Sequence, residues 1–283
     1  MEQVMVVGSG LMGTGIAQTC AQAGFDVLLV DIRQEFLDRS LERLDRQLSK
    51  LVAKGKFAAE QKEAILSRIH PTLELADGTR AALVIEAVSE NLDLKKKVFS
   101  QIDAVCGPDT IIASNTSTLS IAALGGATKR PERCIGLHFF IPAPVMKLVE
   151  IIPSLRTDKA VVAFMQDFAV RIGKTSVLCN DYPGFIVNRL AVPMWNEAMF
   201  LVMEGVSPED VDTALTLGTN MAMGPLATAD FAGLDTVLAT MTALWEGYRD
   251  PKFRPCPLLV KMVESGNLGR KTGRGFYAYD EQA

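Results

Sequence analysis

Short apolar runs alternate with longer amphipathic stretches over the first 180 residues of the chain. The apolar run at residues 3–8 ends in glycine, a helical stretch follows over 13–23, and a second apolar run covers 26–31. Strand, glycine turn, helix and strand in this order are typical of a parallel βαβ unit. The pattern therefore predicts an α/β fold built on a parallel sheet.

The same alternation continues as far as residue 178. Residues 34–68 are rich in Leu, Lys, Glu, Arg and Gln at helical spacing, and Gly55 divides them, which predicts a hairpin of two helices. The remaining apolar runs predict strands, and the remaining amphipathic stretches predict helices. The predicted strands cover residues 82–88, 110–114, 133–140, 147–152 and 175–178, and the predicted helices cover 92–105 and 159–172, with another from about Thr118.

The composition and periodicity of the sequence change after Asn180. Tyr182, Pro183 and Gly184 interrupt the alternation, and the residues beyond them are rich in Ala, Met and Leu at helical period. Pro-Gly is typical of a turn between elements. We therefore predict two domains, an α/β domain over residues 1–180 and a helical domain over residues 181–283.

The composition is that of an ordinary globular protein. The 283 residues are 48% hydrophobic and 22% charged, and a chain of this length can bury a core without cross-links. The net charge of −4 comes without a basic excess along one stretch, so nucleic acid is not an expected partner. No apolar run approaches the about 18 residues of a membrane span, and no signal peptide precedes the first run.

Five cysteines are spread widely along the chain, and none forms a CxxC pair. This spacing predicts neither a disulfide framework nor a zinc site, so no metal is expected. Free thiols favour a reducing compartment. Together with the absence of targeting signals, this predicts a cytoplasmic protein that does not associate with membranes.

A glycine-rich motif follows the first predicted strand and opens the first predicted helix. It reads GSGLMG from Gly8 and fits GxGxxG in the context that dinucleotide binding requires. Gly8 permits a tight turn, Gly10 lets a pyrophosphate approach the backbone, and Gly13 lets the helix pack closely on the strand. Because the helix N-terminus would bind the phosphates, the predicted cofactor contacts include Leu11 and Met12.

An acidic residue closes the second predicted strand. Asp31 lies 18 residues after Gly13, where a carboxylate accepts hydrogen bonds from the adenosine ribose and repels a 2′-phosphate. This predicts NAD rather than NADP as the cofactor, although nearby Arg33 weakens the preference. The alternative is a glycine turn beside a surface aspartate.

The chain has two histidines, His70 and His138. His70 precedes Pro71 at a predicted helix end, which favours a surface or capping role. His138 ends an apolar strand, and Glu150 lies within the next apolar run, MKLVEII. A buried acid is costly without a partner, so we predict that Glu150 holds one imidazole nitrogen while the other transfers a proton. A histidine packed in the core without this role is the alternative.

These motifs resemble those of the L-3-hydroxyacyl-CoA dehydrogenase family, and most of all its short bacterial members, the 3-hydroxybutyryl-CoA dehydrogenases. The resemblance covers essentially the whole chain. The matching motifs are GSGLMGTGIAQ at 8–18, ASNTSTLSI at 113–121, HFFIPAPVMKLVEII at 138–152, DYPGFIVNRL at 181–190, MGPLATADFAGLD at 223–235 and GRKTGRGFY at 269–277.

The resemblance implies a Rossmann-type NAD-binding domain with a helical-hairpin insertion, followed by an all-α domain that contacts the substrate and forms a homodimer. The implied reaction is the reversible NAD-dependent oxidation of a short-chain (S)-3-hydroxyacyl-CoA to the 3-oxoacyl-CoA. The expected pair is 3-hydroxybutyryl-CoA and acetoacetyl-CoA, which belongs to fatty acid and butanoate metabolism. The implied partners are an acyl-CoA thioester and a second copy of the chain.

The matching positions also imply catalytic roles. His138 would be the general base or acid, and Glu150 would orient it. Ser117 would bond the substrate oxygen at C3 and contact the cofactor site, and Asn188 would line the same site. For Ser117 a helix-capping role is the alternative, and for Asn188 a cap or bridge within the helical domain.

The resemblance further implies cofactor contacts for Glu90 and Lys95, near the nicotinamide ribose, and for Lys271 in the C-terminal segment. Simple solvated charges are the alternative for all three. On the predicted hairpin, Lys50 and Lys54, with Lys56 nearby, could meet the phosphates of CoA as point charges. Lys54 is the first candidate among them.

Ile141 is the main departure from the family pattern, and Met221-Ala222, where the family commonly has His-Pro, is a smaller one. Ile141 stands where the family usually has an asparagine beside the nicotinamide, and isoleucine cannot form a side-chain hydrogen bond. Such a loss costs on the order of 1 kcal/mol, or about five- to tenfold in rate or affinity. Two alternatives stay open: a dehydrogenase of a non-CoA 3-hydroxy acid on the same framework, and an inactive NAD-binding protein.

Overall fold

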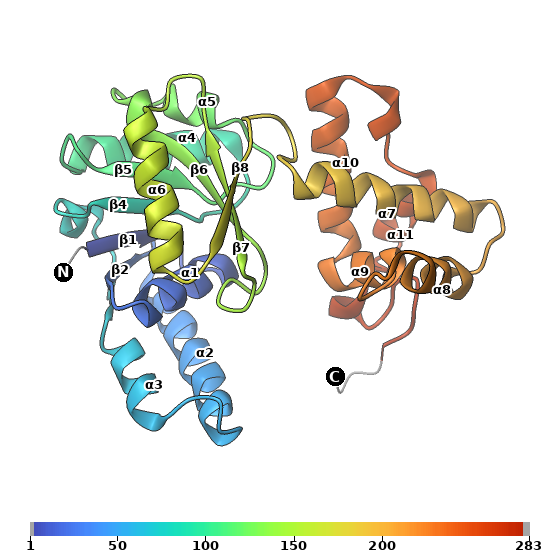
Figure 1. Ribbon diagram of the computed structural model, residues 1–283, viewed down its shortest axis with the longest axis horizontal. Helices are drawn as coiled ribbons and strands as arrows, with labels where there is room; N and C mark the ends of the chain where they lie inside the picture. Colours follow the sequence, from blue (N-terminus) through green and yellow to red (C-terminus); the bar gives the residue numbers. More distant parts are fainter. Residues whose placement is uncertain (1–2, 280–283) are drawn as a thin grey trace. The chain divides into compact units, whose positions relative to one another are not determined.

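The computed structural model describes residues 3–279, which form two compact units that divide between Asp181 and Tyr182. The first unit is a sheet covered by helices, and the second consists of helices (Figure 1). This architecture confirms the predicted fold class, a Rossmann-type α/β domain followed by an all-α domain. None of the helices within residues 3–279 combines the length and the apolarity needed to cross a membrane.

Within the described residues, eight strands form one sheet in the order β3-β2-β1-β4-β5-β6-β7-β8. Their bounds are β1 (Gln3–Val7), β2 (Asp26–Val30), β3 (Ile69–Thr72), β4 (Leu83–Glu86), β5 (Ile111–Ser114), β6 (Cys134–Phe139), β7 (Leu148–Pro153) and β8 (Thr175–Leu178). All neighbouring strands are parallel except β6 and β7, which are antiparallel. The strand order reverses between β1 and β4, and ligands of such sheets bind at the carboxyl ends beside this reversal.

The central strands are apolar because both faces of the sheet are covered. The helices of this unit are α1 (Leu11–Gln22), α2 (Gln34–Ala53), α3 (Ala59–Leu66), α4 (Leu92–Val105), α5 (Ile121–Gly125) and α6 (Lys159–Arg171), with 3-10 turns at Leu75–Gly78 and Pro131–Arg133. Helices α2 and α3 form the predicted hairpin, which projects away from the sheet (Figure 1). Gly55, at φ +67°, lies in the turn between them.

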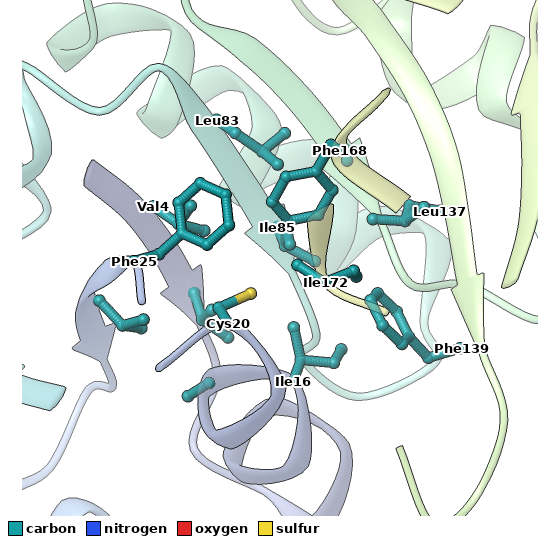
Figure 2. Close-up of a cluster of buried hydrophobic side chains, with 14 of the residues drawn as sticks. Val4, Ile16, Cys20, Phe25, Leu83, Ile85, Leu137, Phe139, Phe168 and Ile172 are labelled. Carbon is teal, nitrogen blue, oxygen red and sulfur yellow. The ribbon is translucent and has the colours of Figure 1, made fainter. Parts of the chain in front are cut away.

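The core between α1, α6 and the sheet fixes the strand ends that carry the site. Figure 2 shows Ile16 of α1, Leu137 of β6 and Phe168 of α6 converging on it. The rings of Phe168 and Phe25 lie 5.4 Å apart at their centroids. Fully burying a large apolar side chain contributes roughly 1.5–3 kcal/mol, so this cluster holds β4 and β6 in a fixed register.

The second unit contains α7 (Val187–Met203), α8 (Pro208–Thr219), α9 (Pro225–Ala232), α10 (Leu234–Tyr248) and α11 (Pro257–Glu264), with 3-10 turns at Pro251–Phe253 and Arg270–Thr272. A buried acid, Asp230, anchors Phe276 and Tyr277 to this unit. Asp230 of α9 accepts hydrogen bonds from the backbone N–H groups of Phe276 and Tyr277, each at 3.0 Å. Phe276 and Tyr277 therefore pack against this helical core.

Two predicted elements differ from the structure. His70 lies in strand β3 rather than at a helix end, and the strand escaped prediction because it is short and contains Pro71. Proline is tolerated there because β3 is the edge of the sheet. The helix expected from about Thr118 begins at Ile121, since Ser120 caps it by accepting a hydrogen bond from the N–H of Ala123 at 3.2 Å.

Candidate active site

The turn between β1 and α1 has the backbone that a diphosphate requires. Gly8 has φ +103°, and a Cβ there would lie 2.7 Å from the carbonyl oxygen of Ala87. A Cβ on Gly13 would overlap the carbonyl oxygen of Gly8, so α1 packs tightly on the turn. Around Gly10, by contrast, a Cβ would meet nothing within 4 Å. No side chain caps the start of α1, which leaves its first N–H groups available to an anion.

A cavity of about 740 Å³ lies beside the turn, lined by the ends of β1 and β2, the start of α2 and the residues after β4. Asp31 lies at this cavity. Its Oδ2 accepts hydrogen bonds from the N–H of Ser9 at 2.7 Å and from Ser9 Oγ at 2.6 Å, which fixes the carboxylate. An open glycine backbone and a fixed carboxylate fit the diphosphate and the adenosine ribose of NAD. Of the other motif residues, Leu11 is exposed and Met12 packs half-buried against the core.

Strand register brings the predicted acid–base pair together. His138 of β6 is directly opposite Glu150 of β7, and opposed residues of antiparallel strands project on the same side. His138 Nδ1 lies 2.7 Å from Glu150 Oε2, and the side chains are only 5% and 0% exposed. A carboxylate at Nδ1 accepts the proton there, so the neutral ring presents its lone pair at Nε2.

Ser117 faces this second nitrogen. Its Oγ lies 3.2 Å from His138 Nε2, on the turn that follows β5. Glu90 organises that turn, because its Oε1 accepts hydrogen bonds from the N–H of Ser117 at 2.8 Å and from Thr116 Oγ1 at 2.5 Å. Ser117, His138 and Glu150 therefore form a continuous chain of polar contacts.

Lys95 is buried, with 1% of its side chain exposed, so the alternative of a solvated charge is wrong for this residue. Its Nζ lies 2.7 Å from Glu86 Oε1 and 3.4 Å from Glu90 Oε2. Sequence reasoning missed Glu86, a fully buried acid at the end of β4. Its signal is the one that identified Glu150, an acid within an apolar run, here ALVIEAV.

The remaining predicted residues lie outside this group. Asn188, half-buried in the first turn of α7, and Lys271, whose ammonium pairs with Asp235, belong to the second unit. Lys50 and Lys54 are exposed at the end of α2. They present accessible positive charge, as does Lys56, which follows in the turn.

Ile141, two residues after the end of β6, is 53% exposed. The cysteine side chains are free thiols rather than nucleophiles prepared for catalysis. Burial raises the pKa of Cys20 to about 12 and that of Cys134 to about 11, which keeps both protonated at neutral pH. No cluster of three or more potential ligands that could hold a metal ion occurs within residues 3–279.

Comparison with known proteins gives matches over the full chain. The profile of the 3-hydroxyacyl-CoA dehydrogenase NAD binding domain matches residues 3–182, and that of the 3-hydroxyacyl-CoA dehydrogenase C-terminal domain matches residues 184–279. A probable 3-hydroxybutyryl-CoA dehydrogenase of Bacillus subtilis is 47% identical, over 100% of this chain and 99% of the relative. The 3-hydroxybutyryl-CoA dehydrogenase of Bradyrhizobium diazoefficiens is 46% identical, over 99% and 96%.

Solved structures agree with these matches. The crystal structure of (S)-3-hydroxybutyryl-CoA dehydrogenase from Ralstonia eutropha superimposes with a TM-score of 0.95 at 44% identity. The alignment covers 99% of this chain and 100% of that one. The similarity therefore includes both units of the chain.

Proposed function

This chain belongs to the 3-hydroxyacyl-CoA dehydrogenase family of NAD-dependent oxidoreductases, and on that basis we propose that it interconverts (S)-3-hydroxybutyryl-CoA and acetoacetyl-CoA. Full-length relatives at 46–47% identity carry the name of this activity, which supports the short substrate. The observation that carries the mechanism is the contact chain Ser117–His138–Glu150, with separations of 3.2 and 2.7 Å.

His138 acts as the base in the oxidation. Its Nε2 takes the proton of the substrate 3-hydroxyl while the hydrogen on C3 leaves as hydride and a carbonyl forms. NAD⁺, when bound, supplies the acceptor of that hydride. In the reduction, the imidazolium returns the proton to the C3 oxygen. A positioned general base contributes about 10²–10⁴-fold to the rate.

Glu150 and Ser117 complete the proton transfer. Glu150 accepts the Nδ1 proton, which keeps Nε2 basic, and its charge stabilises the imidazolium once the substrate proton has arrived. Ser117, within hydrogen-bonding range of Nε2, holds the C3 oxygen of the substrate on the proton's path. Because both His138 and Glu150 are buried, water does not compete for the proton.

Residues of the first unit bind the cofactor. Gly8, Gly10 and Gly13 hold the diphosphate of the cofactor, and Asp31 accepts its adenosine ribose hydroxyls. Lys95 belongs to the cluster that holds Glu90 beside the nicotinamide ribose.

The remaining contacts come from the hairpin and from the second unit. Lys50 and Lys54 attract the CoA phosphates, Asn188 lines the acyl site, and Lys271 contacts the cofactor. Homodimerisation through residues 182–283 is part of the proposal. It is supported by exposed large apolar side chains in that unit, among them Leu217 at 82% and Leu190 at 70%.

The direct test is a steady-state assay that follows NADH absorbance with acetoacetyl-CoA. Thioesters from C4 to C10 are compared, with NADH and NADPH in parallel. We expect the highest kcat/KM with the C4 thioester and NADH. Absence of turnover with every thioester, in protein that still binds NADH, would exclude the proposal and favour an NAD-binding protein without this activity. Light scattering measures the oligomeric state of the same sample.

A further inference from the structure

We infer that Glu86 is a positioning residue of this active site: through Lys95, Glu90 and Ser114 it holds the turn that carries Ser117 against His138. The inference rests on the proposed function for the identity of the reacting group. Glu86 contacts Lys95 and Ser114 directly and reaches Ser117 only through its neighbours, so its effect on the reacting groups is indirect.

The first connection runs through the sheet. Glu86 is the last residue of β4 and pairs in register with Ser114, the last residue of β5. Ser114 Oγ donates a hydrogen bond to Glu86 Oε2 at 2.6 Å, and the same Oγ accepts one from the N–H of Thr116 at 3.2 Å. The carboxylate therefore fixes the point at which the chain leaves β5 and enters the turn that carries Ser117.

The second connection runs through the first turn of α4. Lys95 Nζ donates to Glu86 Oε1 at 2.7 Å and to the carbonyl oxygen of Val88 at 3.1 Å. The same ammonium lies 3.4 Å from Glu90 Oε2, and Glu90 Oε1 accepts the N–H of Ser117. Glu86 thus sets the position of the ammonium that in turn holds Glu90 on the turn.

The burial of this pair is not explained by stability alone. Glu86 is 0% exposed and Lys95 is 1% exposed, and removing two charges from water costs several kcal/mol per ion. Apolar residues of similar volume often stabilise such a position equally well. The pair instead lies at the carboxyl ends of β4 and β5, where ligands of this sheet type bind.

Glu86→Gln is the sharpest variant, because the amide keeps the shape of the side chain while it removes the charge and turns one of the two accepting oxygens into a donor. We expect kcat to fall about tenfold, since displacement of a positioned group by a fraction of an ångström is enough for such a loss. The KM for NADH stays within twofold. The matched control is Asp103→Asn, which removes the charge from another buried ion pair, Asp103 with Arg130 at 2.6 Å, at the opposite end of α4. The control lowers the melting temperature and leaves kcat unchanged.

A double-mutant cycle with Ser117→Ala separates positioning from a merely structural role. If Glu86 acts through Ser117, Glu86→Gln changes kcat less than twofold in the Ser117→Ala background. Asp103→Asn gives the same small effect in both backgrounds. A tenfold loss from Glu86→Gln that persists in full without the Ser117 hydroxyl would overturn the inference, and so would a kcat within twofold of the parent in the Glu86→Gln single variant.

Two further measurements keep the inference testable. If Glu86→Gln fails to fold, Ser114→Ala is used instead, because it removes one hydrogen bond from the same carboxylate and no charge. We expect Ser114→Ala to lower kcat about threefold. An unchanged kcat in this variant contradicts the inference. Independently of activity, the NMR signals of the His138 ring shift in both variants relative to His70, which is exposed on β3. Unshifted His138 signals refute the positioning role whether or not the protein is active. Inactivity on acetoacetyl-CoA, by itself, refutes only the proposed function.

Discussion

Replacing Glu150 by glutamine removes one negative charge from the buried acid–base pair and leaves its shape nearly unchanged. The carboxylate lies 2.7 Å from His138 Nδ1, with neither side chain more than 5% exposed. For charge centres about 4 Å apart at an effective dielectric constant of about 20, the carboxylate stabilises an imidazolium by about 4 kcal/mol. The glutamine oxygen still accepts the Nδ1 proton and retains about 1 kcal/mol of that.

The difference of about 3 kcal/mol corresponds to a loss of about 10²-fold in kcat, because each 1.36 kcal/mol is a factor of ten. Oxidation of (S)-3-hydroxybutyryl-CoA followed by the appearance of NADH measures this loss, because the imidazolium develops in that direction. Substrate deuterated at C3 tests whether hydride transfer limits the rate in the variant, where we expect the full isotope effect. The KM for NAD⁺ is expected to be unchanged.

Asp103→Asn is the control for removing a buried charge elsewhere in the same unit. A Glu150→Gln variant with kcat within threefold of the parent enzyme would show that the carboxylate does not stabilise a developing imidazolium. The role of His138 as the proton carrier would then have to be given up as well, because an unassisted buried imidazole is a poor acceptor of charge.

Four other outcomes follow from the same structure. His138→Gln should lower kcat by about 10²–10⁴-fold with unchanged NADH affinity in a fluorescence titration, and near-normal turnover would contradict the assignment. Lys54→Ala should raise the KM for acetoacetyl-CoA several-fold and leave that for NADH alone; an unchanged thioester KM would weaken the CoA assignment. Asp31→Ala should raise the KM for NADH about tenfold and that for NADPH less, and equal changes would speak against a ribose contact. Burial raises the pKa of Cys20 from 9.0 to about 12, so the unfolded chain loses this proton first, and Cys20 alone lowers stability by about 1.4 kcal/mol per pH unit above pH 9. Melting temperatures between pH 8 and 10.5 should show a decline, and Cys20→Ala should make it shallower without abolishing it, because burial also raises the pKa of Cys134 and Cys179.

The parts of this fold that could be predicted are those in which local pattern and burial agree. The strands β1, β2 and β4 are apolar over most of their length because each lies between two other strands of a sheet covered on both faces, and the hairpin helix α2 has a regular buried stripe. Strand β3 has no such pattern, since an edge strand of four residues buries only Ile69.

Some residues of the candidate site could likewise be predicted from the sequence, and others could not. Glu150 stood out because it interrupts an apolar run, and its cross-strand neighbour is only twelve residues away in the chain. Lys95 lies in a charged stretch, LDLKKK, and nothing in that stretch distinguishes the lysine that turns inward. Its partners come from β4 and from the residues after it, so its burial depends on tertiary packing that local sequence does not encode.

The reversed strand β7 has a consequence for how this enzyme could diversify. In parallel sheets the functional side chains usually extend from loops, which are more mobile and more variable in sequence than the strands. Here the two residues proposed for proton transfer, His138 and Glu150, lie inside a hydrogen-bonded ladder, opposite each other on β6 and β7. Such positions exchange their amide hydrogens only when a large part of the domain opens. Loops around the candidate site can therefore be remodelled for new substrates while the His138–Glu150 pair stays rigid.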